Sequence, residues 1–132
     1  MIDGIKIIVR GYHLDVFKHI NNARILEFME DARWAVFEDF LRHVMKSNDS
    51  VAIVNSNINY RKVASLYQSL WVDGKITKIG NKSFTMQQNI TCLNTGQLIA
   101  DATFICVIVD NESNRSTPIR SQWKELLSRY MD

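Results

Sequence analysis

The chain has 132 residues, a net charge of +2 and 46% hydrophobic residues. This length suits a single domain, residues 1–132, built around one core. The small net charge gives no reason to expect a nucleic acid or an anionic membrane as partner, and no stretch approaches the ~18 apolar residues of a membrane span. The N-terminus lacks the basic start and apolar run of a secretion signal. Cys92 and Cys106 are therefore expected to be reduced thiols in the cytoplasm, the alternative being one disulfide.

The first half of the chain predicts two strands and a long helix. Residues 5–10 form a β-branched run that predicts a short strand. Residues 23–44 repeat apolar side chains at helical spacing over several turns. Phe28 and Trp34 lie off that stripe, which indicates a central helix covered on more than one face. After a polar break, residues 51–61 predict a second strand.

The second half predicts further strands and a closing helix. Three strands are expected, over residues 67–79, 83–93 and 98–109. Turns rich in glycine and asparagine separate them and predict hairpins. Residues 110–116 predict a loop. Thr117 as N-cap and Pro118 at the first helical position would then open an amphipathic last helix.

These elements predict an α+β fold. Consecutive hairpins make the sheet antiparallel, and its apolar face needs a cover. The long helix is the one predicted element large enough to supply it. A curved antiparallel sheet of about five strands, wrapped around one long central helix and followed by a C-terminal helix, is the hotdog arrangement.

Asp15 stands just before the predicted start of the long helix. The free N–H groups of a helix start, strengthened by the helix dipole, polarise a carbonyl group and stabilise an oxyanion. A carboxylate nearby can act as base or nucleophile, and the two together suffice for hydrolysis of an acyl group. The alternative is structural, with Asp15 as a loop or capping residue and Asn21 or Asn22 as the helix N-cap.

The segment around Asp15 carries a motif. Residues 10–15 (Arg-Gly-Tyr-His-Leu-Asp), 19–24 (His-Ile-Asn-Asn-Ala-Arg) and 26–28 (Leu-Glu-Phe) together resemble the signature of hotdog-fold acyl-CoA thioesterases of the 4-hydroxybenzoyl-CoA thioesterase type. Residues 30–34 (Glu-Asp-Ala-Arg-Trp) and 57–61 (Asn-Ile-Asn-Tyr-Arg) are similar to the bacterial long-chain acyl-CoA thioesterase III branch of that family.

The resemblance implies an enzyme that hydrolyses long-chain fatty acyl-CoA thioesters to free fatty acid and coenzyme A, without a cofactor. It makes Asp15 the general base or nucleophile and the backbone N–H of Asn22 the group that polarises the thioester carbonyl. Six further residues would shape the loop and the acyl pocket: Tyr12, His19, Asn21, Ile25, Phe28 and Met29. The family's pairing of sheets implies a homodimer or homotetramer, with the acyl tunnel between the helix and a neighbouring subunit. Lys18 stands where many relatives have glycine, which implies that this turn does not need a glycine-only conformation.

Other readings of the function stay open. The substrate could be a short-chain or aromatic acyl-CoA, or an acyl-carrier-protein thioester. A hotdog hydratase or dehydratase acting on the acyl chain, or a binding subunit without catalysis, would share the fold but not the use of Asp15.

The remaining polar residues give weaker signals. Asn55, Asn57 and Asn59 alternate along one predicted strand, which predicts a polar face or edge that pairs with a second subunit or, alternatively, contacts substrate. Four basic residues could contact coenzyme A phosphates: Arg61, Lys62, Arg115 and Arg120. His13 and His43 have no partner pattern, and with so few histidines and cysteines no metal site is expected.

Overall fold

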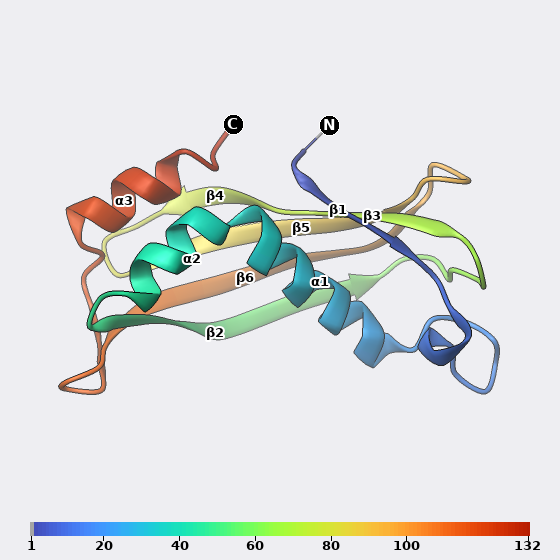
Figure 1. Cartoon of the computed structure of the whole chain (residues 1–132), viewed down its shortest axis with the longest axis horizontal. Coiled ribbons are helices and arrows are strands. Elements are labelled where there is room, and N and C mark those ends of the chain that lie inside the picture. Colours follow the sequence, from blue (N-terminus) through green and yellow to red (C-terminus); the bar gives the residue numbers. More distant parts are fainter. Residues whose placement is uncertain (1) are drawn as a thin grey trace. The chain divides into compact units, whose positions relative to one another are not determined.

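The computed structural model describes residues 2–132, which contain seven strands and three α-helices (Figure 1). The helices are α1 (Asn22–Val36), α2 (Glu38–Met45) and α3 (Ser121–Ser128). The strands are β1 (Gly4–Ile8), β2 (Asp49–Tyr60), β3 (Ser69–Asp73), β4 (Lys75–Ile79), β5 (Ser83–Cys92), β6 (Leu98–Asp110) and β7 (Arg115–Thr117). They belong to one sheet in the order β1-β3-β5-β6-β2, with β4 beside β5 and β7 beside β6. Within residues 2–132, no helix is both long and apolar enough to cross a membrane.

The contacts within the chain divide it into two compact units. The first comprises Met1–Val36, Ile58–Gly74 and Gln88–Ala102, and the second comprises Phe37–Asn57, Lys75–Gln87 and Thr103–Asp132. The prediction of a single domain over residues 1–132 stays a prediction.

In the first unit, α1 packs against β1 and β3 (Figure 1). β1 pairs antiparallel with β3, from Gly4 opposite Asp73 to Ile8 opposite Ser69. The buried side chains of α1 follow one another at helical spacing: Ile25, Phe28, Met29 and Ala32. Of the two residues off the apolar stripe, Phe28 is buried, as expected of a helix covered on more than one face, whereas Trp34 is half-exposed.

In the second unit, α3 packs against α2 and β4. Trp123 and Leu127 of α3 are buried, as its amphipathic pattern predicts. The hydroxyl of Tyr130 accepts a hydrogen bond from the N–H of Phe40 at 3.2 Å, and the ring of Phe40 meets that of Trp123 edge-on. The C-terminal segment is thus fixed by both apolar and polar contacts.

The predicted single helix over residues 23–44 is wrong in one respect, because it is interrupted at Phe37. This residue has φ −99° and ψ 21°, outside helical geometry, and its carbonyl accepts the N–H of Leu41 as the first bond of α2. The Phe37 side chain is fully buried and meets the Tyr130 ring edge-on at 5.0 Å. Tertiary packing of Phe37 therefore accompanies a break that the apolar periodicity does not reveal.

The structure also divides the predicted strand over residues 67–79 into two strands, β3 and β4, which are separated at Gly74. The carboxylate of Asp73 accepts the N–H of Asn89 at 2.7 Å, and the N–H of Gly74 donates to the carbonyl of Asp3. These bonds replace regular strand pairing, so β3 ends and β4 begins anew.

The end of the chain differs from prediction as well. Thr117, predicted to cap the last helix, ends the short strand β7, which lies where a loop was expected. Arg120 precedes α3 in an extended conformation and makes no side-chain capping bond. The buried Ile119 donates its N–H to the carbonyl of Asn81 at 2.8 Å, and this tether delays the helix by several residues.

Candidate active site

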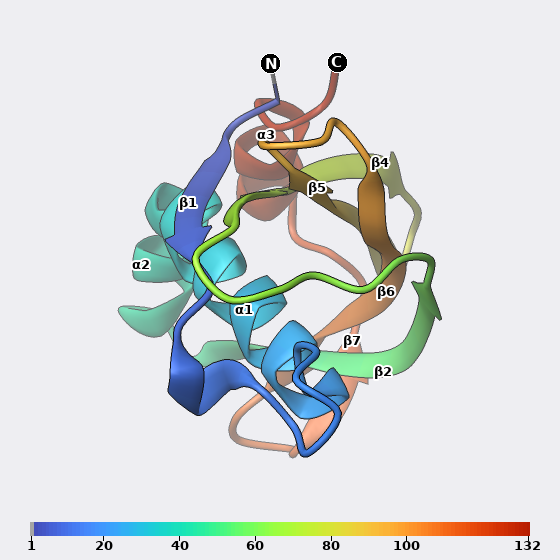
Figure 2. The same ribbon diagram turned by 90° about the vertical axis from the view of Figure 1, so that its right-hand side faces the viewer.

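Asp15 is the first residue of a tight turn before α1. The loop that leads from β1 into α1 is drawn in blue in Figure 2. Oδ1 of Asp15 accepts the N–H groups of Phe17 at 2.8 Å and His19 at 3.3 Å. Its own N–H donates to the carbonyl of His19, which closes the turn from the backbone side. Among residues 2–132, no group donates a hydrogen bond to Oδ2 of Asp15. The carboxylate is therefore held by one oxygen and leaves the other available.

Lys18 gives the turn its shape. Its φ of 65° lies in the left-handed region, which favours glycine. The conformation is one that glycine prefers, yet a lysine adopts it, so this turn does not need a glycine. A side chain in the left-handed region costs roughly 1–2 kcal/mol relative to right-handed geometry.

His13 anchors the turn to the helix, a role that its sequence context did not signal. The ring is buried, its Nδ1 accepts the N–H of Arg10 at 2.9 Å, and it meets the Phe28 ring edge-on at 4.9 Å. Burial lowers the pKa of His13 below 6.5, and the positive charge of Arg24 adds to that effect. His13 is thus a neutral packing residue with the proton on Nε2.

Asn21 is the N-cap of α1, which decides between the two capping candidates. Its Oδ1 accepts the N–H of Ala23 at 2.8 Å, and its carbonyl accepts the N–H of Arg24. Its predicted contact with substrate stays a prediction. Asn22 is the first helical residue, and in residues 2–132 no acceptor takes up its N–H.

A pocket of about 370 Å³ lies at this helix start. Three polypeptide segments line it: residues 20–25 at the start of α1, residues 60–64 at and after the end of β2, and Ile99 of β6. The N–H of Ile20 donates to the carbonyl of Ala64 at 3.1 Å and ties the first two segments together. The lining comprises Ile20, Asn22, Ile25, Tyr60, Arg61, Lys62, Val63, Ala64 and Ile99.

The structure brings only two of the eight predicted site residues into this pocket, Asn22 and Ile25. Asp15 lies in the adjoining turn, seven residues before Asn22 in the chain. Phe28 and Met29 are buried in the single chain, so neither presents an open surface to an acyl chain. Tyr12 is 70% exposed, and its ring lies against that of His13. His19 is exposed and holds the turn through its backbone.

Gln88 supports the helix from the sheet, and the prediction missed it. It is fully buried; its Nε2 donates to the carbonyls of Met29 and Asp73 at 3.0 Å each, and its Oε1 accepts from Arg33. The signal was present in the sequence, since Gln88 shares the alternating buried face of β5 with Phe84, Met86 and Ile90. A polar residue on that face has to find partners inside the fold.

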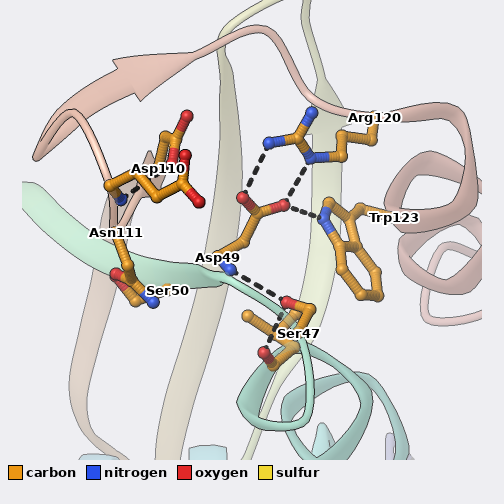
Figure 3. A network of polar contacts seen from close by, with 9 residues as sticks. Ser47, Asp49, Ser50, Asp110, Asn111, Arg120 and Trp123 are labelled. Carbon is orange, nitrogen blue, oxygen red and sulfur yellow. Dashed lines mark hydrogen bonds and ion pairs between the residues drawn. The ribbon is translucent and has the colours of Figure 1, made fainter.

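Another aspartate, Asp49, lies in the second unit, and both oxygens of its carboxylate accept hydrogen bonds (Figure 3). Its two oxygens accept Nε and Nη2 of Arg120 at 2.6 and 2.9 Å, and the indole N–H of Trp123 at 2.7 Å. The hydrogen bonds from Arg120, against the opposing effect of burial, lower the pKa of Asp49 below 3.8. Arg120, a candidate for binding coenzyme A phosphates, is thus committed to Asp49.

Within residues 2–132, no group of three histidine, cysteine or acidic side chains could hold a metal ion. Cys92 and Cys106 are both buried, and neither takes part in a disulfide in this structure.

The fold and the helix-start pocket fit one class of protein. The family model of the Thioesterase-like superfamily matches residues 9–127, and the chain belongs to that family. The long-chain acyl-CoA thioesterase FadM of Escherichia coli (strain K12) is 38% identical over 125 residues, which cover 93% of this chain and 95% of FadM. The motif resemblance to thioesterases is thereby confirmed.

Solved structures of other proteins share this fold. YbaW, a probable thioesterase from Escherichia coli, is 36% identical, with a TM-score of 0.85 over 97% of this chain and 98% of that one. SAV2348 from Staphylococcus aureus, solved in complex with CoA, is 15% identical, with a TM-score of 0.86 over 98% of this chain and 85% of that one. The second likeness shows the fold alone. The predicted α+β hotdog fold is confirmed.

Proposed function

We propose that the protein hydrolyses fatty acyl-CoA thioesters to the free fatty acid and coenzyme A. The observation that carries this proposal is the pocket at the start of α1, where Asn22 meets apolar side chains such as Ile25 and Ile99. A helix start supplies N–H donors to a carbonyl oxygen, and apolar walls suit an acyl chain. The similarity to FadM over nearly the whole chain supports the same activity, including its preference for long chains.

The proposed reaction uses two groups of the chain. The N–H of Asn22 donates to the thioester carbonyl oxygen and stabilises the negative charge that develops there. Asp15, through its unbonded Oδ2, takes a proton from a water molecule that attacks the carbonyl carbon. The carbon–sulfur bond then breaks, and the thiolate of coenzyme A leaves and is protonated. As the alternative, Oδ2 attacks the carbonyl carbon itself, and water hydrolyses the resulting anhydride.

We also propose a homodimer, or a tetramer built from it, through β2. This strand ends the sheet order, and its residues 53–57 are exposed, with Val54 60% exposed. A long exposed edge strand presents unpaired N–H and carbonyl groups that favour pairing with another strand. Pairing there would bring a second subunit near Tyr60 and the pocket wall that follows it. Cytoplasmic location is likewise proposed, because buried cysteines that form no disulfide suit a reducing compartment.

The substitution Asp15→Asn tests the proposal, since it keeps the size of the side chain and an oxygen that can accept the turn's N–H groups. We expect kcat for decanoyl-CoA to fall by about 10²–10⁴-fold, the usual contribution of a general base. Release of free thiol reports the rate, circular dichroism reports folding, and mass spectrometry checks that the asparagine has not deamidated.

Asp31→Asn is the matched control, because Asp31 is an exposed aspartate on α1 of the same unit. Its kcat should stay within about twofold of the wild type, as expected for a surface substitution far from special features. Near-normal turnover by a folded Asp15→Asn protein would refute the catalytic role and leave Asp15 as a turn residue.

A further inference from the structure

Arg61, on the wall of the pocket, is held in a fixed orientation. Its Nε donates to Oδ2 of Asp101 at 2.7 Å, and its Nη2 lies 3.4 Å from Oδ1. Asn59 donates to the same Oδ1 at 2.9 Å and so fixes the carboxylate from a second side. The hydrogen bond from Arg61, followed by that from Asn59, lowers the pKa of Asp101 below 3.8, so the carboxylate stays charged. All three residues belong to the first unit.

This arrangement leaves part of the guanidinium unused. No acceptor among residues 2–132 takes the N–H groups of Nη1. Lys62, the next residue, is exposed, lines the same pocket and has no acidic partner in that part of the chain. No aspartate or glutamate belongs to the pocket lining. Because Asp101 balances the charge of Arg61, the net positive charge of this wall comes from Lys62.

An oriented guanidinium and a free ammonium group side by side suit one kind of ligand group. Arginine offers planar, paired N–H donors that match phosphate oxygens, and lysine adds a mobile point charge. Coenzyme A carries three phosphate groups, whereas the pantetheine part that bears the thioester carries none. The wall at residues 61–62 could therefore distinguish a coenzyme A thioester from the thioester alone.

We propose that Arg61 and Lys62 bind a phosphate group of the coenzyme A part of the substrate, with Asp101 as the residue that positions Arg61. This inference rests on the proposed thioesterase function and deepens it. It selects coenzyme A thioesters by their phosphates and leaves Asn22 and Asp15 to act on the thioester itself.

Three substrates with one acyl chain test it: decanoyl-CoA, decanoyl-3′-dephospho-CoA and decanoyl-pantetheine. The wild type should show a kcat/KM at least tenfold higher for decanoyl-CoA than for decanoyl-pantetheine, the effect of about one partly exposed charge-assisted hydrogen bond. If decanoyl-3′-dephospho-CoA resembles decanoyl-CoA, the diphosphate is bound; if it resembles decanoyl-pantetheine, the 3′-phosphate is bound.

Arg61→Gln and Lys62→Gln should each lower this kcat/KM ratio, mainly through a higher KM for decanoyl-CoA, and added salt should lower the wild-type ratio too. The matched controls are Arg129→Gln and Lys46→Gln, which remove exposed charges outside the pocket lining and should keep the wild-type ratio. If the control variants lowered the kcat/KM ratio as much as the test variants, the effect would come from net charge alone, and the proposal would be overturned.

Asp101→Asn separates orientation from charge. It adds one positive charge to the wall, so a purely electrostatic site would hold decanoyl-CoA more tightly and raise the ratio. An oriented Arg61 instead requires Asp101, and the ratio should fall. A raised ratio would overturn the positioning role. Equal kcat/KM values of the wild type for decanoyl-CoA and decanoyl-pantetheine would refute the phosphate site while leaving the thioesterase function intact, and no hydrolysis of any of the three would instead refute that function.

Discussion

Two aspartates of this protein stand in opposite surroundings. Asp49 is buried, and its two oxygens accept three N–H groups from Arg120 and Trp123 (Figure 3). Asp15 is half-buried, holds its own turn through Oδ1 and keeps Oδ2 without a donor from residues 2–132. A saturated carboxylate stabilises structure, whereas a carboxylate with a spare oxygen can take a proton. The comparison therefore predicts loss of stability at one site and loss of turnover at the other.

The largest stability effect is expected at Asp49. In Asp49→Asn, the new amide group must direct an N–H at Arg120 or Trp123, which themselves donate. The free energy of unfolding should fall by about 2 kcal/mol, as expected when hydrogen bonds to a buried charged group are lost. Urea unfolding measures the change.

Measurements of kcat also distinguish Asp49 from Asp15. The kcat of the folded fraction of Asp49→Asn should stay within a few fold of the wild type, in contrast to Asp15→Asn. Glu112→Gln, which neutralises an exposed acid in the loop before β7, serves as control and should leave the urea midpoint unchanged. A stable but inactive Asp49→Asn protein would contradict the assignment of a structural role to Asp49 and a catalytic role to Asp15.

The two regions should also lose stability in different pH ranges. Burial lowers the pKa of His13 beside the turn, so the unfolded chain binds that proton more readily and stability falls as the pH drops below 6.5. Bonding to Arg120 lowers the pKa of Asp49, so its contribution is complete above 3.8 and is lost as the pH falls further. In urea titrations, His13→Gln should flatten the first decline and Asp49→Asn the second. If one variant flattened both declines in stability, the assignment of the first to His13 and the second to Asp49 would be contradicted.

The smallest effect is expected at Lys18. Lys18→Gly relieves the left-handed backbone of the turn but adds flexibility to the unfolded chain, so a net gain of about 0.5 kcal/mol is expected. Thermal unfolding measures the shift. Lys82→Gly is the control, since Lys82 is not among the residues with positive φ in the part of the chain described and should lose stability. Destabilisation by Lys18→Gly would mean that the lysine side chain itself supports the turn.

The fold was predictable because its signals are local. Apolar periodicity over residues 23–44 gave the helix, and the glycines at the turns gave the hairpins, where Gly96 indeed has φ 77° and donates to the carbonyl of Cys92. The breaks at Phe37 and Gly74 were not predictable in this way. They depend on partners such as Tyr130 and Asp3, which lie far away in the sequence.

The candidate site was predictable only in its motif. Asp15, Asn21 and Asn22 follow one another in a recognisable order, but the wall formed by residues 60–64 joins them through a contact between distant segments, that of Ile20 with Ala64. The roles predicted for Phe28 and Met29 stay predictions, because they depend on an acyl tunnel beside a neighbouring subunit, and in the single chain both side chains are buried.

Release of free thiol from a series of acyl-CoA substrates is the most direct test of the proposed fatty acyl-CoA thioesterase activity. From acetyl- to palmitoyl-CoA, each methylene group that enters the apolar pocket should contribute about 0.8 kcal/mol. The wild-type kcat/KM should therefore rise about fourfold per carbon over several carbons and then level off as the pocket fills. A flat profile, a maximum at acetyl-CoA or benzoyl-CoA, or no thiol release at all would contradict the proposal.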